Sequence, residues 1–179
     1  KARRNVTIEW DGVNDMTPWR YGLTLAVGLE PPAKLTSSPR FDYMAATAPM
    51  LGLGRRVEAA DNAAAAGILS GSAMVDLYSQ VYSDAGTGGD WAGRAEKLRE
   101  AYVARDPAAR LAAMQDLWNG APNPDARHAR QVLTAFAAAR MPVSSDMSDQ
   151  AGALIASMLT AGLDRNAMKW SSVVDAGSE

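Results

Sequence analysis

The chain has 179 residues, a formal net charge of −2 and no cysteine. The nearly balanced charge argues against nucleic acid as a partner, because nucleic-acid-binding surfaces are usually basic. The missing cysteine excludes disulfides and thiolate metal sites. Hydrophobic residues make up 47% of the sequence, which is too much for a wholly disordered chain.

No segment approaches the roughly 18 consecutive apolar residues of a transmembrane helix, so we expect no transmembrane segment. The chain starts at Lys1 and shows no signal-peptide pattern, so it is interpreted as a mature form or as a fragment of a larger protein. A protein without cysteine suits a bacterial cytoplasm or a bacterial periplasm, and the sequence does not choose between them.

Residues 1–17 are predicted to form an extended arm. Val6, Ile8 and Trp10 alternate with other residues as in a short strand, which Asp11-Gly12 would end. Because no second clear strand follows, we expect this segment to pack in an extended form on the helices. Residues 18–179 are predicted to form a single helical domain.

Two Pro-containing signals mark the first helices. Thr17-Pro18 and Ser38-Pro39 each place a capping residue before a proline at the first helical position, where the missing N–H costs nothing. The helices predicted before the glycine-rich loop at residues 85–89 cover about 18–29, 39–51, 55–69 and 72–84. The last of them should bury a face made of Met74, Leu77, Tyr78 and Val81.

Residues 90–120 show the clearest helical hairpin in the sequence. Asp90 is predicted to cap the first helix, and Asp106-Pro107 ends that helix and starts the next. Helices joined this tightly should lie side by side and antiparallel. The predicted buried residues are Trp91, Ala95, Leu98 and Tyr102 on the first helix and Leu111, Met114, Leu117 and Trp118 on the second.

Three more helices are predicted after a rigid, proline-containing connection. They cover about residues 125–140, 147–161 and 164–174. Their predicted buried residues include Ala129, Val132, Leu133 and Phe136, followed by Leu154, Ile155 and Met158. Every second helix starts near 18, 55, 91, 125 and 164, so the steps are about 34 to 39 residues. This spacing is typical of a two-helix repeat, but any run of helices of average length would show similar steps.

The sequence offers few residues for catalysis. His128 is the only histidine and lies between Arg127 and Arg130, which opposes metal binding. We therefore expect a solvent-facing histidine, no metal and no cofactor. Glu9 and Asp11 flank Trp10, as in some sugar-binding fragments, although a surface turn is the default interpretation. The glycine-rich stretch at 86–89 lacks the lysine of a phosphate-binding loop and is interpreted as a connector.

One polar face is a candidate binding surface. Arg127, Arg130, Gln131 and Thr134 are predicted to share the face of their helix opposite the apolar stripe. An anionic ligand or partner could bind there, and the alternative is an ordinary solvated face.

These observations predict an all-α protein with eight to nine helices in antiparallel pairs, forming either an α-solenoid-like array or an irregular bundle. The leading functional hypothesis is a non-catalytic scaffold or binding domain that presents a groove to a protein or peptide partner. Two alternatives remain: a helical or accessory domain of a cell-wall or polysaccharide-processing enzyme, and a carrier of a small apolar ligand.

Overall fold

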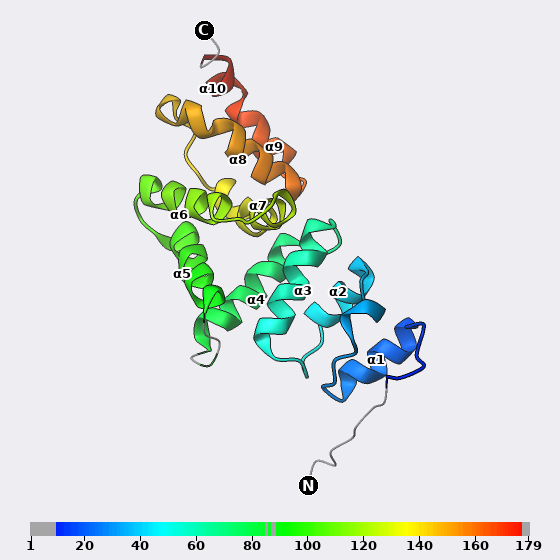
Figure 1. Ribbon diagram of the computed structural model, residues 1–179. Coiled ribbons are helices and arrows are strands. Elements are labelled where there is room, and N and C mark those ends of the chain that lie inside the picture. The colour runs from blue at the N-terminus through cyan, green and yellow to red at the C-terminus, as the bar shows by residue number, and fades with distance from the viewer. Residues whose placement is uncertain (1–9, 85, 87–88, 177–179) are drawn as a thin grey trace.

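The structure, a computed structural model, describes residues 10–84, 86 and 89–176. All regular structure in this part of the chain is helical, and it contains no strand. The helices, joined by short 3₁₀ turns and loops, run from one end of an elongated molecule to the other (Figure 1). They are α1 (Pro18–Ala26), α2 (Pro39–Ala46), α3 (Leu53–Ala65), α4 (Gly71–Ser83), α5 (Asp90–Val103), α6 (Pro107–Asn119), α7 (Pro124–Ala138), α8 (Ser148–Thr160), α9 (Asp164–Ala167) and α10 (Ser171–Ala176).

The predicted starts at Pro18, Pro39 and Pro107 are confirmed, although the Ser38 side chain makes no capping hydrogen bond, and α7 begins one residue before the predicted Asp125. Helices α1, α2, α6 and α7 each begin at a proline. The side chains of Thr17, Asp106 and Asn123 accept hydrogen bonds from backbone N–H groups in the first turn of the helix that each precedes. The prediction that Asp90 caps its helix is wrong. Asp90 is the first residue of α5, and the cap position belongs to Gly89, whose φ of +75° suits glycine.

Several helix ends are shifted from their predicted positions: α1 ends at Ala26 and α3 spans Leu53–Ala65. Two helices differ more. Helix α2 ends at Ala46 and does not continue past Pro49, because a proline disfavours helical geometry in the residue before it. The predicted helix 164–174 is divided into α9, a 3₁₀ turn (Met168–Trp170) and α10. Ala167, Trp170 and Val173 are all buried. Ala167 ends α9, Trp170 ends the 3₁₀ turn and Val173 lies in α10, so each of the three short elements contributes one residue to the core.

The α5–α6 hairpin has the predicted antiparallel arrangement. Near the turn, Arg110 Nε donates a hydrogen bond to the Ala101 carbonyl oxygen. Farther along both helices, Lys97 Nζ lies 3.2 Å from Asp116 Oδ2. The contacts therefore pair residues at increasing distance from the turn on both helices. In the N-terminal segment, Val6 and Ile8 lie outside the described residues, and residues 10–17 form neither a helix nor a strand.

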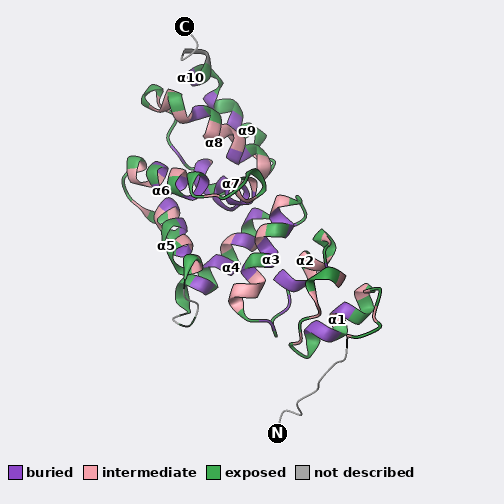
Figure 2. Cartoon of the chain, in the orientation of Figure 1, coloured by how far each residue is buried: buried purple, intermediate pink, exposed green. Residues whose placement is uncertain are grey.

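The buried residues form two clusters that meet at α7. The first cluster contains residues of α1 to α5 together with Leu117, and the second lies mainly between α6, α8 and the C-terminal turns. Helix α7 contributes Val132 and Leu133 to the first cluster and Ala137 and Ala138 to the second. In Figure 2 the buried residues, coloured purple, accordingly include a stretch of α7 in the middle of the molecule.

Helix α7 also packs against α3 and α4. In a linear repeat array each repeat contacts only its neighbours, whereas three helices separate α3 from α7 in the chain. This contact favours an irregular bundle in the middle of the molecule. The close approach of α4 to α7 depends on Gly71, because a Cβ there would lie 2.7 Å from the Val132 carbonyl oxygen. Phe136 lies beside this crossing and is 39% exposed, so its predicted burial is wrong.

Within the described residues, no helix has the length and apolar character needed to cross a membrane. The same part of the chain has no group of three or more metal-ligating side chains that could hold a metal ion.

Candidate binding groove

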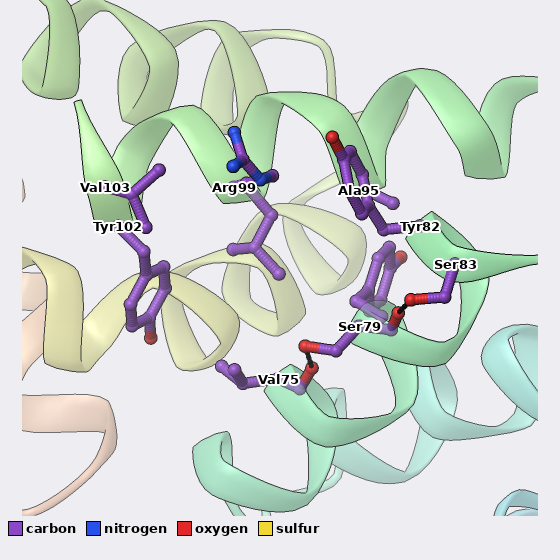
Figure 3. Close-up of a pocket in the computed structure, with 10 residues that line it drawn as sticks. Val75, Ser79, Tyr82, Ser83, Ala95, Arg99, Tyr102 and Val103 are labelled. Atoms are coloured by element: carbon purple, nitrogen blue, oxygen red, sulfur yellow. Dashed lines mark hydrogen bonds between the residues drawn. The ribbon is translucent and has the colours of Figure 1, made fainter.

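A groove of about 260 Å³ lies between α4 and α5. The two helices face each other across it, and each contributes half of the lining (Figure 3). The lining residues are Val75, Tyr78, Ser79, Tyr82 and Ser83 from α4 and Ala95, Leu98, Arg99, Tyr102 and Val103 from α5.

The groove combines a buried apolar floor with an exposed apolar rim. Tyr78, Ala95 and Leu98 are almost completely buried and form part of the first core cluster. Tyr82 and Val103 are 51% and 58% exposed. Burying large apolar side chains away from water lowers the free energy. An apolar rim that is continuous with the core is therefore suited to binding a partner that covers it.

The polar groups of the groove are mostly occupied by the protein itself. Ser79 Oγ donates a hydrogen bond to the Val75 carbonyl oxygen at 2.8 Å, and Ser83 Oγ donates to the Ser79 carbonyl oxygen at 3.0 Å (Figure 3). Tyr102 Oη donates to the Leu133 carbonyl oxygen of α7 at 3.0 Å. Burial raises the pKa of Tyr102 to about 12, so its hydroxyl stays neutral at physiological pH. The groove therefore offers mainly apolar contacts.

Arg99 supplies the charge at the groove. Its guanidinium carbon lies 5.3 Å from the centre of the Tyr82 ring, within the range of a cation–π interaction. Among the described residues that line the groove, Arg99 is the charged one, and none of them is a carboxylate. The electrostatics at this rim thus favour an acidic group on a partner.

Tyr78 connects the floor of the groove to a buried polar cluster. Its hydroxyl donates to Asp61 Oδ1 at 3.1 Å, and Arg94 Nη1 lies 2.8 Å from Asp61 Oδ2. Arg94 Nη1 also donates to Tyr78 Oη at 3.1 Å. Burial raises the pKa of the Tyr78 hydroxyl well above its ordinary value, and the Asp61 carboxylate adds to this rise. Burial also raises the pKa of Asp61, an effect that Arg94 opposes.

Arg130 lies near this cluster. Its side chain is 9% exposed, and Nη1 donates to the Leu117 carbonyl oxygen at 2.8 Å. Burial lowers the pKa of Arg130 from its ordinary value, and the positive charge of Arg94 lowers it further. The guanidinium group of Arg94 stacks on the Trp91 ring, and its central carbon lies 3.9 Å from the ring centre.

The four residues of the predicted polar face do not share one exposed surface. Arg127 is exposed and Gln131 is half-buried, whereas Arg130 and Thr134 are buried. Thr134 Oγ1 accepts a hydrogen bond from Trp118 Nε1 at 2.9 Å and lies 3.2 Å from Ser157 Oγ, so it is committed to the core. The prediction that all four share one exposed face is therefore wrong for Arg130 and Thr134. They are buried because α7 packs against helices on more than one side.

The other candidate residues lie apart from the groove. His128 is half-buried and lines a different cavity, which also contains Gly71 and Phe136. Glu9 and residues 87–88 of the glycine-rich stretch fall outside the described residues. From the sequence, some of the groove residues were predicted to be buried in the core, and no role was predicted for the others. Tyr82 directly follows the buried stripe of α4 in the sequence, but its exposure, which marks the rim of the groove, is evident only in the structure.

Compared with known proteins, the chain matches no protein-family model, no curated protein sequence and no solved structure. The geometry of these sites is therefore the basis for inferring its function.

Proposed function

We propose that the protein is a non-catalytic helical binding domain whose α4–α5 groove receives an apolar segment of a protein or peptide partner. The observation that carries this proposal is the continuity between the exposed rim, formed by Tyr82 and Val103, and the buried floor beneath it. A partner side chain placed in the groove would remove both rim residues from water and add to an existing core.

The size of the groove supports a peptide over a small-molecule ligand. Pockets for small molecules usually enclose roughly 300–1,000 Å³ and bury most of the ligand. The α4–α5 groove encloses about 260 Å³, and its rim is open. A volume of this size suits one or two anchoring side chains of a larger partner.

The chemistry of the groove defines the partner further. The backbone N–H and C=O groups of α4 and α5 are hydrogen-bonded within each helix. The groove therefore offers no sheet edge to which a peptide could bind as an added strand. An amphipathic helix can instead insert bulky apolar residues between α4 and α5. Arg99 at the rim would pair with an acidic residue beside those anchors. We therefore propose a short, acidic amphipathic helix as the bound segment.

A second candidate function is supported by a different cavity. Glu58, Asp61 and Asp125 line a cavity of about 340 Å³ together with Asn62, Asn123 and Trp91. Carboxylates, amides and an aromatic ring suit a sugar, and a pair of carboxylates can hydrolyse a glycosidic bond. However, Asp61 already accepts hydrogen bonds from Tyr78 and Arg94. Polysaccharide binding or processing is therefore the second choice.

A peptide-display selection can test the groove directly. Helical peptides selected on the wild-type protein should carry large apolar residues at helical spacing beside Asp or Glu. Tyr82→Ala should weaken their binding about tenfold or more, because it removes half of the exposed rim. Tyr43→Ala is the matched control, since Tyr43 is 45% exposed on α2 and away from the groove.

Two results would contradict the proposal. One is equal loss of affinity for Tyr82→Ala and Tyr43→Ala. The other is a selection that yields only peptides without apolar anchors. If the protein instead hydrolyses a polysaccharide and Glu58→Gln or Asp125→Asn stops the reaction, the second candidate function replaces the first.

A further inference from the structure

The geometry points to a binding site for a small phosphate-type oxyanion between α5, α6 and the middle of α7, with Arg94 and Arg130 as its cationic groups. These side chains line a cavity of about 390 Å³ on a face of α5 different from the peptide groove. Besides the two arginines, the lining that matters here is Asp90, Gly93, Lys97, Asp116 and Gly120.

The buried charges of this region are unbalanced. Asp61 is bonded to Arg94, so that pair is neutral. Arg130 is 9% exposed, and no carboxylate of the described residues lies within 4.0 Å of it; Asp61 and Asp90 act on its charge only from farther away. Buried charges in proteins are normally paired or bind a ligand, because removing an unpaired charge from water is costly. An anion beside Arg130 would supply the missing partner.

The hydrogen-bonding capacity of the two guanidinium groups is also only partly used. Each has five N–H donors. The Nε atoms of Arg94 and Arg130 are both buried without a hydrogen-bond partner in the described structure. Arg130 uses Nη1 for the Leu117 carbonyl oxygen. Because the two Nε atoms have almost no accessible surface, an oxyanion in the cavity would bind the terminal Nη groups instead, through charge-assisted hydrogen bonds that are stronger than neutral ones.

The balance of charge distinguishes this cavity from the one on the other side of the same arginines. On the α5–α6 side, Arg94, Lys97 and Arg130 face two carboxylates, Asp90 and Asp116. Lys97 lies 3.2 Å from Asp116 and 3.3 Å from Glu100, so its charge is already neutralised by carboxylates. On the other side, three carboxylates line the cavity with the same two arginines. After these pairings the α5–α6 cavity retains Arg130 and Asp90 and is close to neutral, whereas the other side has an excess of carboxylates, so an anion is repelled less at the α5–α6 cavity.

Glycine keeps the cavity open. A Cβ at Gly93 would meet nothing within 4 Å, so this position of α5 borders empty space. At Gly120, a Cβ would lie 3.3 Å from Arg130 Nη1. The absence of side chains at these positions leaves room for the Arg130 guanidinium and for a ligand beside it.

Titration calorimetry with inorganic phosphate, at constant ionic strength and with chloride as the reference anion, tests this site. We expect saturable phosphate binding to the wild-type chain and a higher Tm in phosphate than in chloride. Arg130→Gln should weaken phosphate binding about tenfold or more. Arg127→Gln is the matched control, because it removes an exposed arginine from the same helix.

Gly93→Glu provides a second test that does not disturb the buried cluster. The new side chain would enter open space and place a negative charge at the cavity, so the protein should fold and lose phosphate binding. Gly152→Glu makes the same exchange on α8, where the position is also exposed and free of contacts, and it should keep phosphate binding.

Binding of phenyl phosphate and of acetate shows whether the site prefers a phosphate group, free or as an ester, or a carboxylate. Binding of both phosphates but not acetate would assign the site to phosphate groups, free or as an ester, whereas tighter binding of acetate would overturn the phosphate assignment. The proposal also fails if phosphate shows no saturable binding, or if Arg130→Gln and Gly93→Glu bind it as well as their controls. Because Tyr82→Ala leaves this cavity intact, its phosphate binding should equal that of the wild-type chain, and the two proposals can fail independently.

Discussion

The hydrogen bond between Trp118 Nε1 and Thr134 Oγ1 shows how single side chains join α6 to α7. Trp118 is 2% exposed and belongs to the second core cluster. Thr134 Oγ1 also donates to the Arg130 carbonyl oxygen, so both hydroxyl functions are used in the core. The pair therefore satisfies a buried polar group while it buries a large aromatic ring.

Replacing this indole should strongly destabilise the fold. Trp118→Ala would leave a large cavity and remove one of the hydrogen bonds of Thr134, and we expect the free energy of unfolding to fall by about 3–5 kcal/mol. Trp19→Ala is the control, because Trp19 is 77% exposed on α1 and should cost little. Urea titrations of both variants measure the difference. A loss below about 1 kcal/mol for Trp118→Ala would contradict its role in the core.

At the scale of whole helices, the crossing of α4 and α7 depends on Gly71. A Cβ at this position would approach the Val132 carbonyl oxygen to 2.7 Å, and backbone atoms cannot move aside as a flexible side chain can. The same crossing places Phe136 beside Gly71 and leaves its ring partly exposed. Local sequence patterns identify both helices but not this contact between them.

Alanine at position 71 should therefore separate the two helices. Gly71→Ala is expected to lower the free energy of unfolding by about 1–3 kcal/mol, the usual range for overpacking. Gly152→Ala introduces the same methyl group on an exposed face of α8 and should stabilise by up to about 1 kcal/mol, because alanine favours helices. Thermal unfolding of the two variants checks the opposite signs. Equal effects would show that the α4–α7 crossing is not closely packed.

At the scale of the molecule, α7 links two clusters of buried residues. Because it contributes side chains to both, we expect them to unfold together. Met158→Ala, in the second cluster, should cost about 2–5 kcal/mol. Amide hydrogen exchange should then show lower protection in α3 as well as in α8. Loss of protection confined to α8 would mean that the two clusters unfold separately.

The sequence by itself determined the all-helical class and most helix positions. Pro18, Pro39 and Pro107 mark helix starts through local geometry, and the stripe of Met74, Leu77, Tyr78 and Val81 marks the buried face of α4 through its periodicity. These signals depend on residues close together in the chain, so they can be interpreted without the fold.

Only the tertiary structure decided which faces meet. The pattern of α7 shows one apolar stripe, but its contacts with α3, α4, α6 and α8 also bury Arg130 and Thr134, which lie outside that stripe. The groove and the arginine cavity likewise combine residues from separate helices. Helix packing is set by contacts between distant parts of the chain, which leave no periodic signal in the sequence. Both candidate sites therefore became visible only in the folded chain.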